Sequence, residues 1–213
     1  MSARPLTIML VKGRPLEAAR GLLERAGLAI EDDALNGRQL LFADREGRAQ
    51  FAIVKSVDVP VYVERGAADI GILGREVLLE SPVDVYRPLT LPIGRCRLSL
   101  CAPEGTPPDF FRSRATVRIA TKFPRVTREW FGARGVSVDV MMLESSVELA
   151  PRMGLADAIV DLVETGRTLR ENGLVVLTEL ADIACEVIVN RAAYHLRPDV
   201  QPLLDRLSEA TSC

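Results

Sequence analysis

Apolar runs of strand length, each followed by a loop and a helix-like segment, most constrain the fold of this chain. Leu6–Val11 is the first such run, and a helix-like segment at residues 15–26 follows it and stops at Gly27. Apolar runs without strict alternation are typical of strands buried on both faces of a parallel sheet. Further runs occur at residues 50–54, 68–74, 117–121, 138–143 and 158–163. The alternation predicts an α/β protein.

A break in this pattern predicts two lobes. Pro92, Gly94 and Arg95 separate two apolar runs, and strand and helix alternate again beyond them. We therefore expect a first lobe of residues 1–92, a second of residues 93–180, and a return of residues 181–213 to the first. Two such lobes with anion-binding turns predict a two-lobed fold like that of periplasmic binding proteins, with an active-site cleft between the lobes.

Composition excludes several classes of protein. With 48% hydrophobic residues and a net charge of -2 over 213 residues, the chain can bury a sizeable core and lacks the bias of a disordered protein. The start has no signal-peptide pattern, and no apolar run nears the roughly 18 residues that span a bilayer, so we expect a cytoplasmic protein without a membrane partner. The absence of a basic run argues against a nucleic-acid partner.

The cysteines, the histidine and the lysines carry weaker signals. Four cysteines without C-x-x-C spacing and a single histidine, His195, make a zinc site improbable and favour reduced thiols. No nucleophile motif flanks His195, so it is expected to be incidental. Only Lys12, Lys55 and Lys122 are lysines among 27 basic residues. Retained ammonium groups can reflect phosphate or carboxylate partners, and chance explains them equally well.

The segment at residues 158–168 is typical of a phosphate-binding loop. It combines a buried strand with a loop that carries Thr165, Gly166 and Thr168, and Thr168 is expected to cap a following helix. Backbone N–H groups, two hydroxyls and a glycine favour an anionic ligand, while Asp157 and Asp161 can bind ribose hydroxyls or Mg²⁺. A capped helix after a strand without any ligand remains an alternative for this motif.

Cations follow the first strand. Lys12 and Arg14 come directly after Leu6–Val11, and ligands of open α/β sheets sit beyond the carboxyl ends of the strands. An anion is therefore expected near Lys12 and Arg14. A solvated turn is the alternative.

Longer motifs around this loop resemble the signature of the ATP phosphoribosyltransferase family. They read Glu-Leu-Ala-Pro-x-x-Gly-Leu-Ala-Asp at residues 148–157 and Asp-Leu-Val-x-Thr-Gly-x-Thr-Leu-x-x-Asn-Gly-Leu at residues 161–174. In that family the region holds the 5-phosphate and ribose of phosphoribosyl pyrophosphate (PRPP). The resemblance implies PRPP contacts for Glu148, Asp157, Asp161, Glu164, Thr165, Gly166, Arg167 and Thr168.

The resemblance extends to the start of the chain. Lys-Gly-Arg after the first strand and Arg-x-Leu-x-Phe at residues 38–42 also match the family. They imply that Lys12, Arg14 and Arg38 act on the pyrophosphate as catalytic cations. An exposed Arg38 without a ligand is the alternative.

Residues 55–74 resemble the family's nucleotide-side wall. The resemblance implies nucleotide contacts for Lys55, Asp69, Gly71 and Gly74. Lys55 stands where the family pattern has arginine, and a point charge cannot copy a bidentate fork. Plain strand packing is the alternative for the glycines. Ser145 also departs from the family, which has glycine there, and a positive φ would strain a serine.

The implied reaction is attack of adenine N1 of ATP on C1 of PRPP, with Mg²⁺ as cofactor and without a general base. Because about thirty residues follow the second crossing, we expect no regulatory domain. The resemblance instead implies a regulatory subunit similar to histidyl-tRNA synthetase and a homodimer within a hetero-oligomer. A non-catalytic two-lobed sensor of nucleotides or small anions is the alternative.

Overall fold

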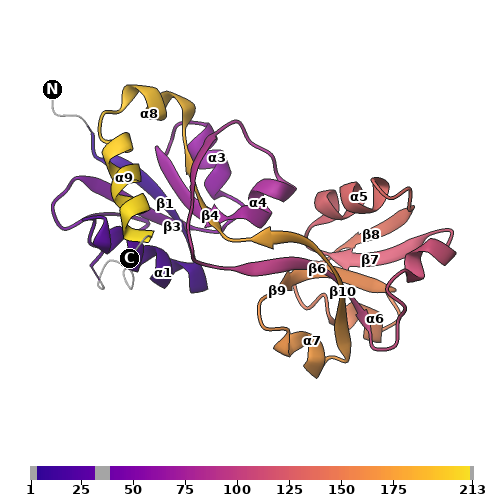
Figure 1. Ribbon diagram of the computed structural model, residues 1–213. Coiled ribbons are helices and arrows are strands. Elements are labelled where there is room, and N and C mark those ends of the chain that lie inside the picture. The colour runs from indigo at the N-terminus through magenta and orange to yellow at the C-terminus, as the bar shows by residue number, and fades with distance from the viewer. Residues whose placement is uncertain (1–3, 32–38, 212–213) are drawn as a thin grey trace. The chain divides into compact units, whose positions relative to one another are not determined.

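The computed structural model describes residues 4–31 and 39–211, except for the side chain of Arg14. The chain divides into two compact units, each with its own sheet (Figure 1). Unit 1 contains Met1–Leu78, Pro82–Gly94 and Ala184–Cys213, and unit 2 contains Leu79–Ser81 and Arg95–Ile183. Apart from the short segment Leu79–Ser81, the chain crosses between the units at 94/95 and 183/184, two and three residues after the positions expected from the sequence.

Unit 1 is built on a six-stranded sheet of order β2-β3-β1-β4-β11-β5. β1 is parallel to β3 and β4, whereas β2, β11 and β5 pair antiparallel. The strands are β1 Leu6–Val11, β2 Leu41–Ala43, β3 Ala49–Val54, β4 Ile70–Gly74, β5 Tyr86–Thr90 and β11 Cys185–Val189.

Helices cover both faces of this sheet (Figure 1). α1 Arg14–Arg25 and α9 Val200–Thr211 pack on one face, where Leu23 and Leu207 meet Ile8 of β1 in one cluster. α3 Val59–Glu64 and α4 Arg75–Glu80 pack on the other. The short helix α8 Arg191–Leu196 precedes α9. Burial on both faces explains why β1 is apolar except for Thr7.

Unit 2 has a five-stranded sheet of order β10-β6-β9-β7-β8. β7 is parallel to β8 and β9, and β6 pairs antiparallel with β9 and β10. The strands are β6 Cys96–Pro103, β7 Val117–Thr121, β8 Val138–Met142, β9 Ala158–Val163 and β10 Leu174–Ile183. η1 Phe110–Ser113 and α5 Pro124–Gly132 cover one face, and α6 Leu149–Arg152 and α7 Arg167–Glu171 cover the other.

The expected α/β class and several strands are confirmed, including β1, β7 and β9 at their expected bounds. Beyond β11 the chain forms two helices, and Asn190 caps the first, α8, by accepting the Ala193 N–H at 3.0 Å. β10 runs from Leu174 to Ile183 and pairs with the full length of β6.

Trp130 and Phe131 belong to the core of unit 2. Phe131 is fully buried, and Trp130 packs against it with ring centroids 4.8 Å apart. His195 packs against Tyr86 and Tyr194, and its Nε2 lies 3.0 Å from Tyr86 Oη. These contacts indicate a packing role for His195 in unit 1.

Candidate functional site

The carboxyl edge of the unit 2 sheet gathers most of the expected PRPP residues. Lys122 follows β7, Asp161 lies near the end of β9, and Glu148 is the N-cap residue of α6. Thr121 connects β9 to the turn after β7, because its hydroxyl donates to Val160 O at 2.6 Å and accepts from Phe123 N at 2.9 Å. The turn that carries Lys122 is thereby fixed against β9.

Asp161 is the electrostatic centre of this edge. Burial raises the pKa of its carboxyl group, the hydrogen bond from the Leu162 N–H and the charge of Lys122 oppose that shift, and Glu148 adds to it. Burial likewise raises the pKa of the Cys101 thiol to about 12, with Asp161 and Glu148 contributing. Cys101 therefore stays a neutral thiol and is no candidate nucleophile.

The loop after β9 differs from the expected one at its cap. Gly166, with φ 69°, is the N-cap residue of α7, and Thr168 lies inside the helix, so the expected capping by Thr168 was wrong. Glycine adopts this left-handed conformation without strain. Glu164, Thr165 and Thr168 are exposed. Two hydroxyls are thus accessible within one turn.

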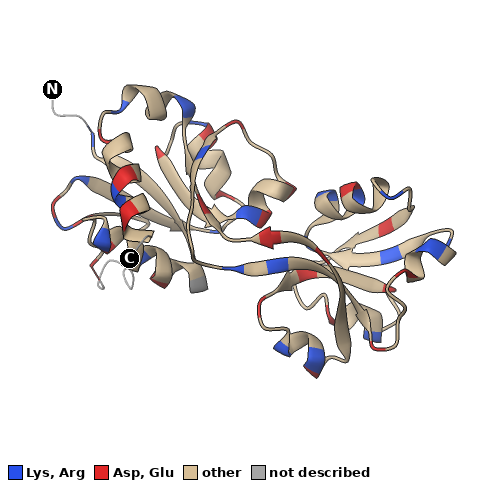
Figure 2. Cartoon of the chain, viewed as in Figure 1, with Lys and Arg blue, Asp and Glu red and all other residues tan. Residues whose placement is uncertain are grey.

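Arginines flank the loop, and α7 is marked blue by Arg167 and Arg170 in Figure 2. Arg167 is 81% exposed and pairs with Glu171 at 2.8 Å, one turn along the helix. Arg170 donates to Thr165 O at 3.2 Å and so ties the loop to α7. An exposed pair of this kind is weak, which leaves Arg167 available to an anion.

The carboxyl edge of unit 1 carries the expected cations. Lys12 follows β1, Lys55 follows β3, and both side chains are exposed. Lys12 N donates to Val54 O at 3.1 Å, which places both lysines at the same edge of neighbouring parallel strands. The side chain of Arg14 and all of Arg38 lie outside the described part of the chain.

The two expected nucleotide-side glycines differ in what surrounds them. A Cβ at Gly71 would lie 2.6 Å from Val59 Cγ1 and 3.0 Å from Val63 Cγ2, so this glycine lets α3 pack on β4. Gly74 ends β4, and the carboxylate of Glu76 folds over it. Burial raises the pKa of Glu76. Sequence reasoning missed Glu76, although its place directly after a Gly-Ile-Leu-Gly strand was a signal.

Asp69 lies at the amino end of its strand, where it is almost fully buried, far from the edge that carries Lys12. It accepts from Thr7 N at 2.9 Å and from both terminal nitrogens of Arg4 at 2.7 and 2.8 Å. A third arginine contact comes from Arg197 at 3.6 Å. With its lone pairs committed, Asp69 is a structural residue, and we leave it out of the nucleotide site.

Asp157 occupies the same position in unit 2. It accepts from Arg118 N at 2.9 Å and pairs with the side chains of Arg118 and Arg114 at 2.9 and 2.7 Å. Burial alone would raise the pKa of Asp157, but these hydrogen bonds outweigh it and hold the pKa below its usual value. Of the two aspartates expected to bind ribose hydroxyls, Asp157 thus precedes β9 and is engaged by arginines, whereas Asp161 lies near the end of β9 that leads into the loop.

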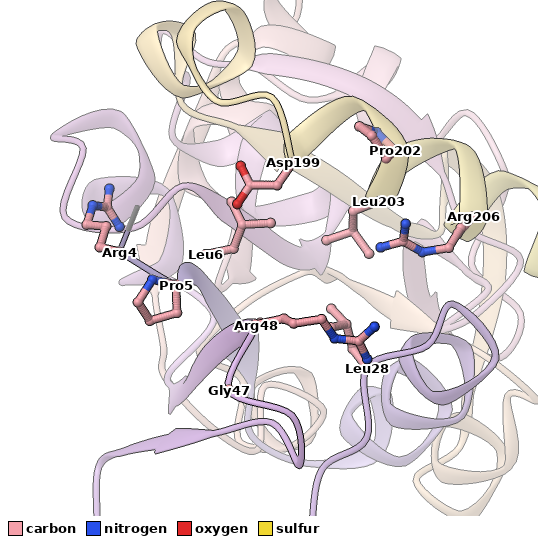
Figure 3. Close-up of a pocket in the computed structure, with 11 residues that line it drawn as sticks. Arg4, Pro5, Leu6, Leu28, Gly47, Arg48, Asp199, Pro202, Leu203 and Arg206 are labelled. Carbon is pink, nitrogen blue, oxygen red and sulfur yellow. The ribbon is translucent and has the colours of Figure 1, made fainter. Parts of the chain in front are cut away.

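A cavity of about 440 Å³ opens at the amino edge of unit 1 (Figure 3). Figure 3 shows Arg48 ending beside Leu28 and Arg206 extending towards Leu203 in this cavity. Both guanidinium groups bind the end of α1, since Arg206 donates to Ala26 O at 2.7 Å and Arg48 donates to Gly27 O. They cap the helix C-terminus, which favours cations. These arginines are thus structural, and the cavity is separate from Lys12 and Lys55.

The turn before α6 contains Ser145, which stands where the family pattern has glycine. The residue with positive φ in the turn before α6 is Ser146, at 52°, and Ser145 does not have positive φ. The glycine of the family pattern is therefore not required here for its left-handed conformation at position 145. Any strain in the turn belongs to Ser146.

The fold defines a class of protein. It consists of two α/β units like those of periplasmic binding proteins, each with polar groups at the carboxyl edge of its sheet. The aliphatic sulphonate binding protein SsuA from Escherichia coli is similar in structure, with a TM-score of 0.62 at 16% identity, covering 99% of this chain and 74% of that one. This likeness concerns the fold alone.

Sequence comparison then gives the family. The pattern described as HisG: ATP phosphoribosyltransferase matches residues 55–209, and the chain belongs to the ATP phosphoribosyltransferase family. The ATP phosphoribosyltransferase of Oceanobacillus iheyensis is 45% identical over 206 residues, covering 96% of this chain and 98% of the relative. That of Symbiobacterium thermophilum is 47% identical over 211 residues, covering 98% and 96%.

A solved structure agrees with this assignment. The ATP phosphoribosyl transferase (HisG:HisZ) complex from Thermotoga maritima contains a chain with a TM-score of 0.82 and 36% identity, covering 97% of this chain and 98% of that one. Separately, no helix within the described residues is long and apolar enough to cross a membrane.

Proposed function

We propose that this chain transfers the 5-phosphoribosyl group of PRPP to N1 of ATP, giving phosphoribosyl-ATP and pyrophosphate in the first step of histidine biosynthesis. The observation that carries the proposal is its family membership, with relatives of the same name matched over almost the whole chain. The accessible hydroxyls of Thr165 and Thr168 in unit 2 support it, because they suit a phosphate. Family membership also favours an enzyme over the sensor.

In this proposal Thr165, Gly166, Arg167 and Thr168 bind the 5-phosphate, and Asp161 with Glu148 binds the ribose hydroxyls. Lys12, Arg14 and Arg38 bind the pyrophosphate, while Lys55 and Gly74 belong to the nucleotide side. Asp69 and Asp157 are assigned to the fold instead, since arginine side chains already pair with their carboxylates. Gly71 is assigned to the fold because side chains of α3 occupy the space above it. Glu164 stays a PRPP candidate by its place after β9.

The reaction requires no general base from the protein. The lone pair of adenine N1 forms the new bond to C1, and the C1–O bond breaks with its electrons leaving on pyrophosphate. Because negative charge grows on the leaving group, cations placed against it stabilise the transition state more than the ground state. Lys12, Arg14 and Arg38 have that role in our proposal. The 5-phosphate contacts hold C1 in place for the attack.

We propose Mg²⁺ as cofactor, held mainly by the phosphates of PRPP. Among the described residues, no group of three or more His, Cys, Asp and Glu side chains is placed to hold a metal ion. Bound Mg²⁺ would neutralise part of the pyrophosphate charge. A cytoplasmic location stays a prediction.

The proposed partner is a regulatory subunit similar to histidyl-tRNA synthetase, in a hetero-oligomer built around a homodimer of this chain. The support is the Thermotoga maritima structure, which is a HisG:HisZ complex. The experiment that tests the activity is incubation of the chain, with that subunit, with ATP, PRPP and Mg²⁺. Mass spectrometry should detect phosphoribosyl-ATP and equimolar pyrophosphate. Unchanged ATP and PRPP would refute the proposed function.

A further inference from the structure

One buried polar atom in unit 2 has no partner. Among the described residues, Ser99 Oγ is the buried side-chain nitrogen or oxygen for which no hydrogen bond occurs, and Ser99 is 0% exposed. The backbone of Ser99 is engaged, since its carbonyl accepts a weak bond from Cys101 Sγ at 3.7 Å. A buried hydroxyl without a partner costs about 1–3 kcal/mol, so its presence needs an explanation.

Ser99 lies opposite Asp161. β6 and β9 are antiparallel neighbours (Figure 1), and their register pairs Ser99 with Asp161 and Cys101 with Ile159. Directly opposed residues in such a pair share one face of the sheet, with Cβ atoms about 5 Å apart. The Ser99 hydroxyl is thus placed beside the Asp161 carboxylate, on the side away from solvent.

The surroundings leave the hydroxyl few other partners. Cys101 and Ile159 belong to the apolar cluster under α6 and α7. Leu98 and Leu100, its neighbours along β6, point into the cluster on the opposite face. The charged groups that act on Asp161 are Lys122, which attracts it, and Glu148, which repels it. Rotation about χ1 moves a serine hydroxyl among three staggered positions, so the carboxylate is within reach of a small change.

We propose that Ser99 is a positioning residue for the Asp161 carboxylate. When PRPP binds, the Ser99 hydroxyl donates to one carboxylate oxygen from the interior of unit 2, and the remaining lone pairs of the carboxylate face the ribose hydroxyls. This rests on the proposed function, in which Asp161 binds ribose. A carboxylate oxygen accepts two hydrogen bonds, so both roles fit one group. The hydroxyl finds its partner in the bound state, where the carboxylate is held in a single orientation.

A double-mutant cycle tests this proposal. Calorimetric titration with PRPP and Mg²⁺ would compare the wild-type chain, Ser99→Ala, Asp161→Ala and the double variant. Ser99→Ala should weaken PRPP binding about three- to tenfold, the size expected for one hydrogen bond, and leave ATP binding unchanged. In the Asp161→Ala background, which has no side-chain acceptor at this position, the same substitution should change PRPP affinity less than twofold, because the hydroxyl acts through the carboxylate.

Thermal unfolding separates this role from a structural one. Ser99→Ala should leave Tm unchanged or raise it, since it removes an unpartnered buried hydroxyl. Ser99→Thr, which keeps the hydroxyl, should retain PRPP affinity better than Ser99→Ala. Ser113→Ala is the matched control in unit 2, because the Ser113 hydroxyl already donates to Phe110 O at 3.0 Å. It should leave PRPP affinity unchanged.

Two results would overturn the positioning role: PRPP affinity unaffected by Ser99→Ala, or an equal loss in the wild-type and Asp161→Ala backgrounds. A wild-type chain that binds no PRPP, with or without the regulatory subunit, would instead refute the proposed function itself.

Discussion

At the scale of single residues, glycines serve different purposes in the two sheets. Gly71 leaves room for α3, since Val59 and Val63 fill the space above it. Gly166 supplies a left-handed conformation at the start of α7. Gly74 leaves room for the carboxylate of Glu76. Both glycines of this motif therefore make room for a neighbouring side chain, at Gly71 for the valines of α3 and at Gly74 for the Glu76 carboxylate.

Gly71→Ala should destabilise unit 1. The added Cβ would meet Val59 Cγ1 at 2.6 Å and Ile188 Cγ1 at 3.1 Å, so α3 has to shift from β4. We expect a loss of about 1–3 kcal/mol in the free energy of unfolding, measured by urea denaturation. Gly21→Ala within α1 is the control, because only Arg25 Nη1 lies near, at 3.8 Å. It should gain up to about 1 kcal/mol. Equal stability of Gly71→Ala and wild type would return Gly71 to the nucleotide site.

At the scale of elements, both units repeat one strand–helix–strand arrangement with an aspartate at the amino end of its second strand. Asp69 precedes β4 and binds the backbone of Thr7, and Asp157 precedes β9 and binds the backbone of Arg118. In each case the aspartate N–H also donates back, to Thr7 O at 2.9 Å and to Arg118 O at 2.8 Å. These reciprocal bonds clamp the starts of two parallel strands, and the opposite edge stays open for ligands.

The Asp157 clamp should be visible in the pH dependence of stability. Its pKa lies below the ordinary value of 3.8, so the carboxylate stabilises the fold above that pH and loses this contribution as the pH falls through its depressed pKa. Asp157→Asn should therefore unfold about 1–3 kcal/mol more easily at pH 7, with the difference closing in strong acid.

Asp109→Asn is the matched control for that substitution, because Asp109 makes no capping hydrogen bond at η1. It should change stability by less than about 0.5 kcal/mol. PRPP affinity should stay within twofold of wild type in Asp157→Asn. A loss of PRPP binding at unchanged stability would restore Asp157 to the ligand site.

The loop before α7 should bind the 5-phosphate through its hydroxyls. Thr165→Ala and Thr168→Ala each remove one donor, and a hydrogen bond to a charged group contributes roughly 1.5–3 kcal/mol. PRPP affinity should fall about ten- to hundredfold in each variant, measured by calorimetry, while ATP affinity changes little. Thr106→Ala, in the turn after β6, is the control for a threonine away from the loop. Equal weakening of ATP and PRPP would contradict the assignment.

At the scale of the whole molecule, we expect feedback control to need a second protein. In the proposed hetero-oligomer the regulatory subunit, and not this chain, binds histidine, and two sites on two proteins are then coupled. The isolated chain should show no heat of histidine binding, and its activity should be low or insensitive to histidine until the subunit is added. Micromolar histidine binding by the isolated chain would refute this division of roles.

The sequence by itself determined the α/β class, the two units and the loop at residues 164–168, and it did so for local reasons. Buried parallel strands are mainly apolar, and a loop that receives phosphate favours glycine and hydroxyls, so β1, β7, β9 and Gly166 can be read from their own residues. The long motifs around this loop indicated the family.

Only the tertiary structure decided which end of a strand each motif residue occupies and what lies above it. Asp157 and Asp161 are four residues apart in neighbouring motifs, yet the first is paired with Arg114 and Arg118 and the second lies near the loop. Ser99 gave no signal in the sequence, because its importance comes from β6 pairing with β9 across 62 residues of chain. Contacts between distant segments set these roles, and periodicity along one segment does not contain them.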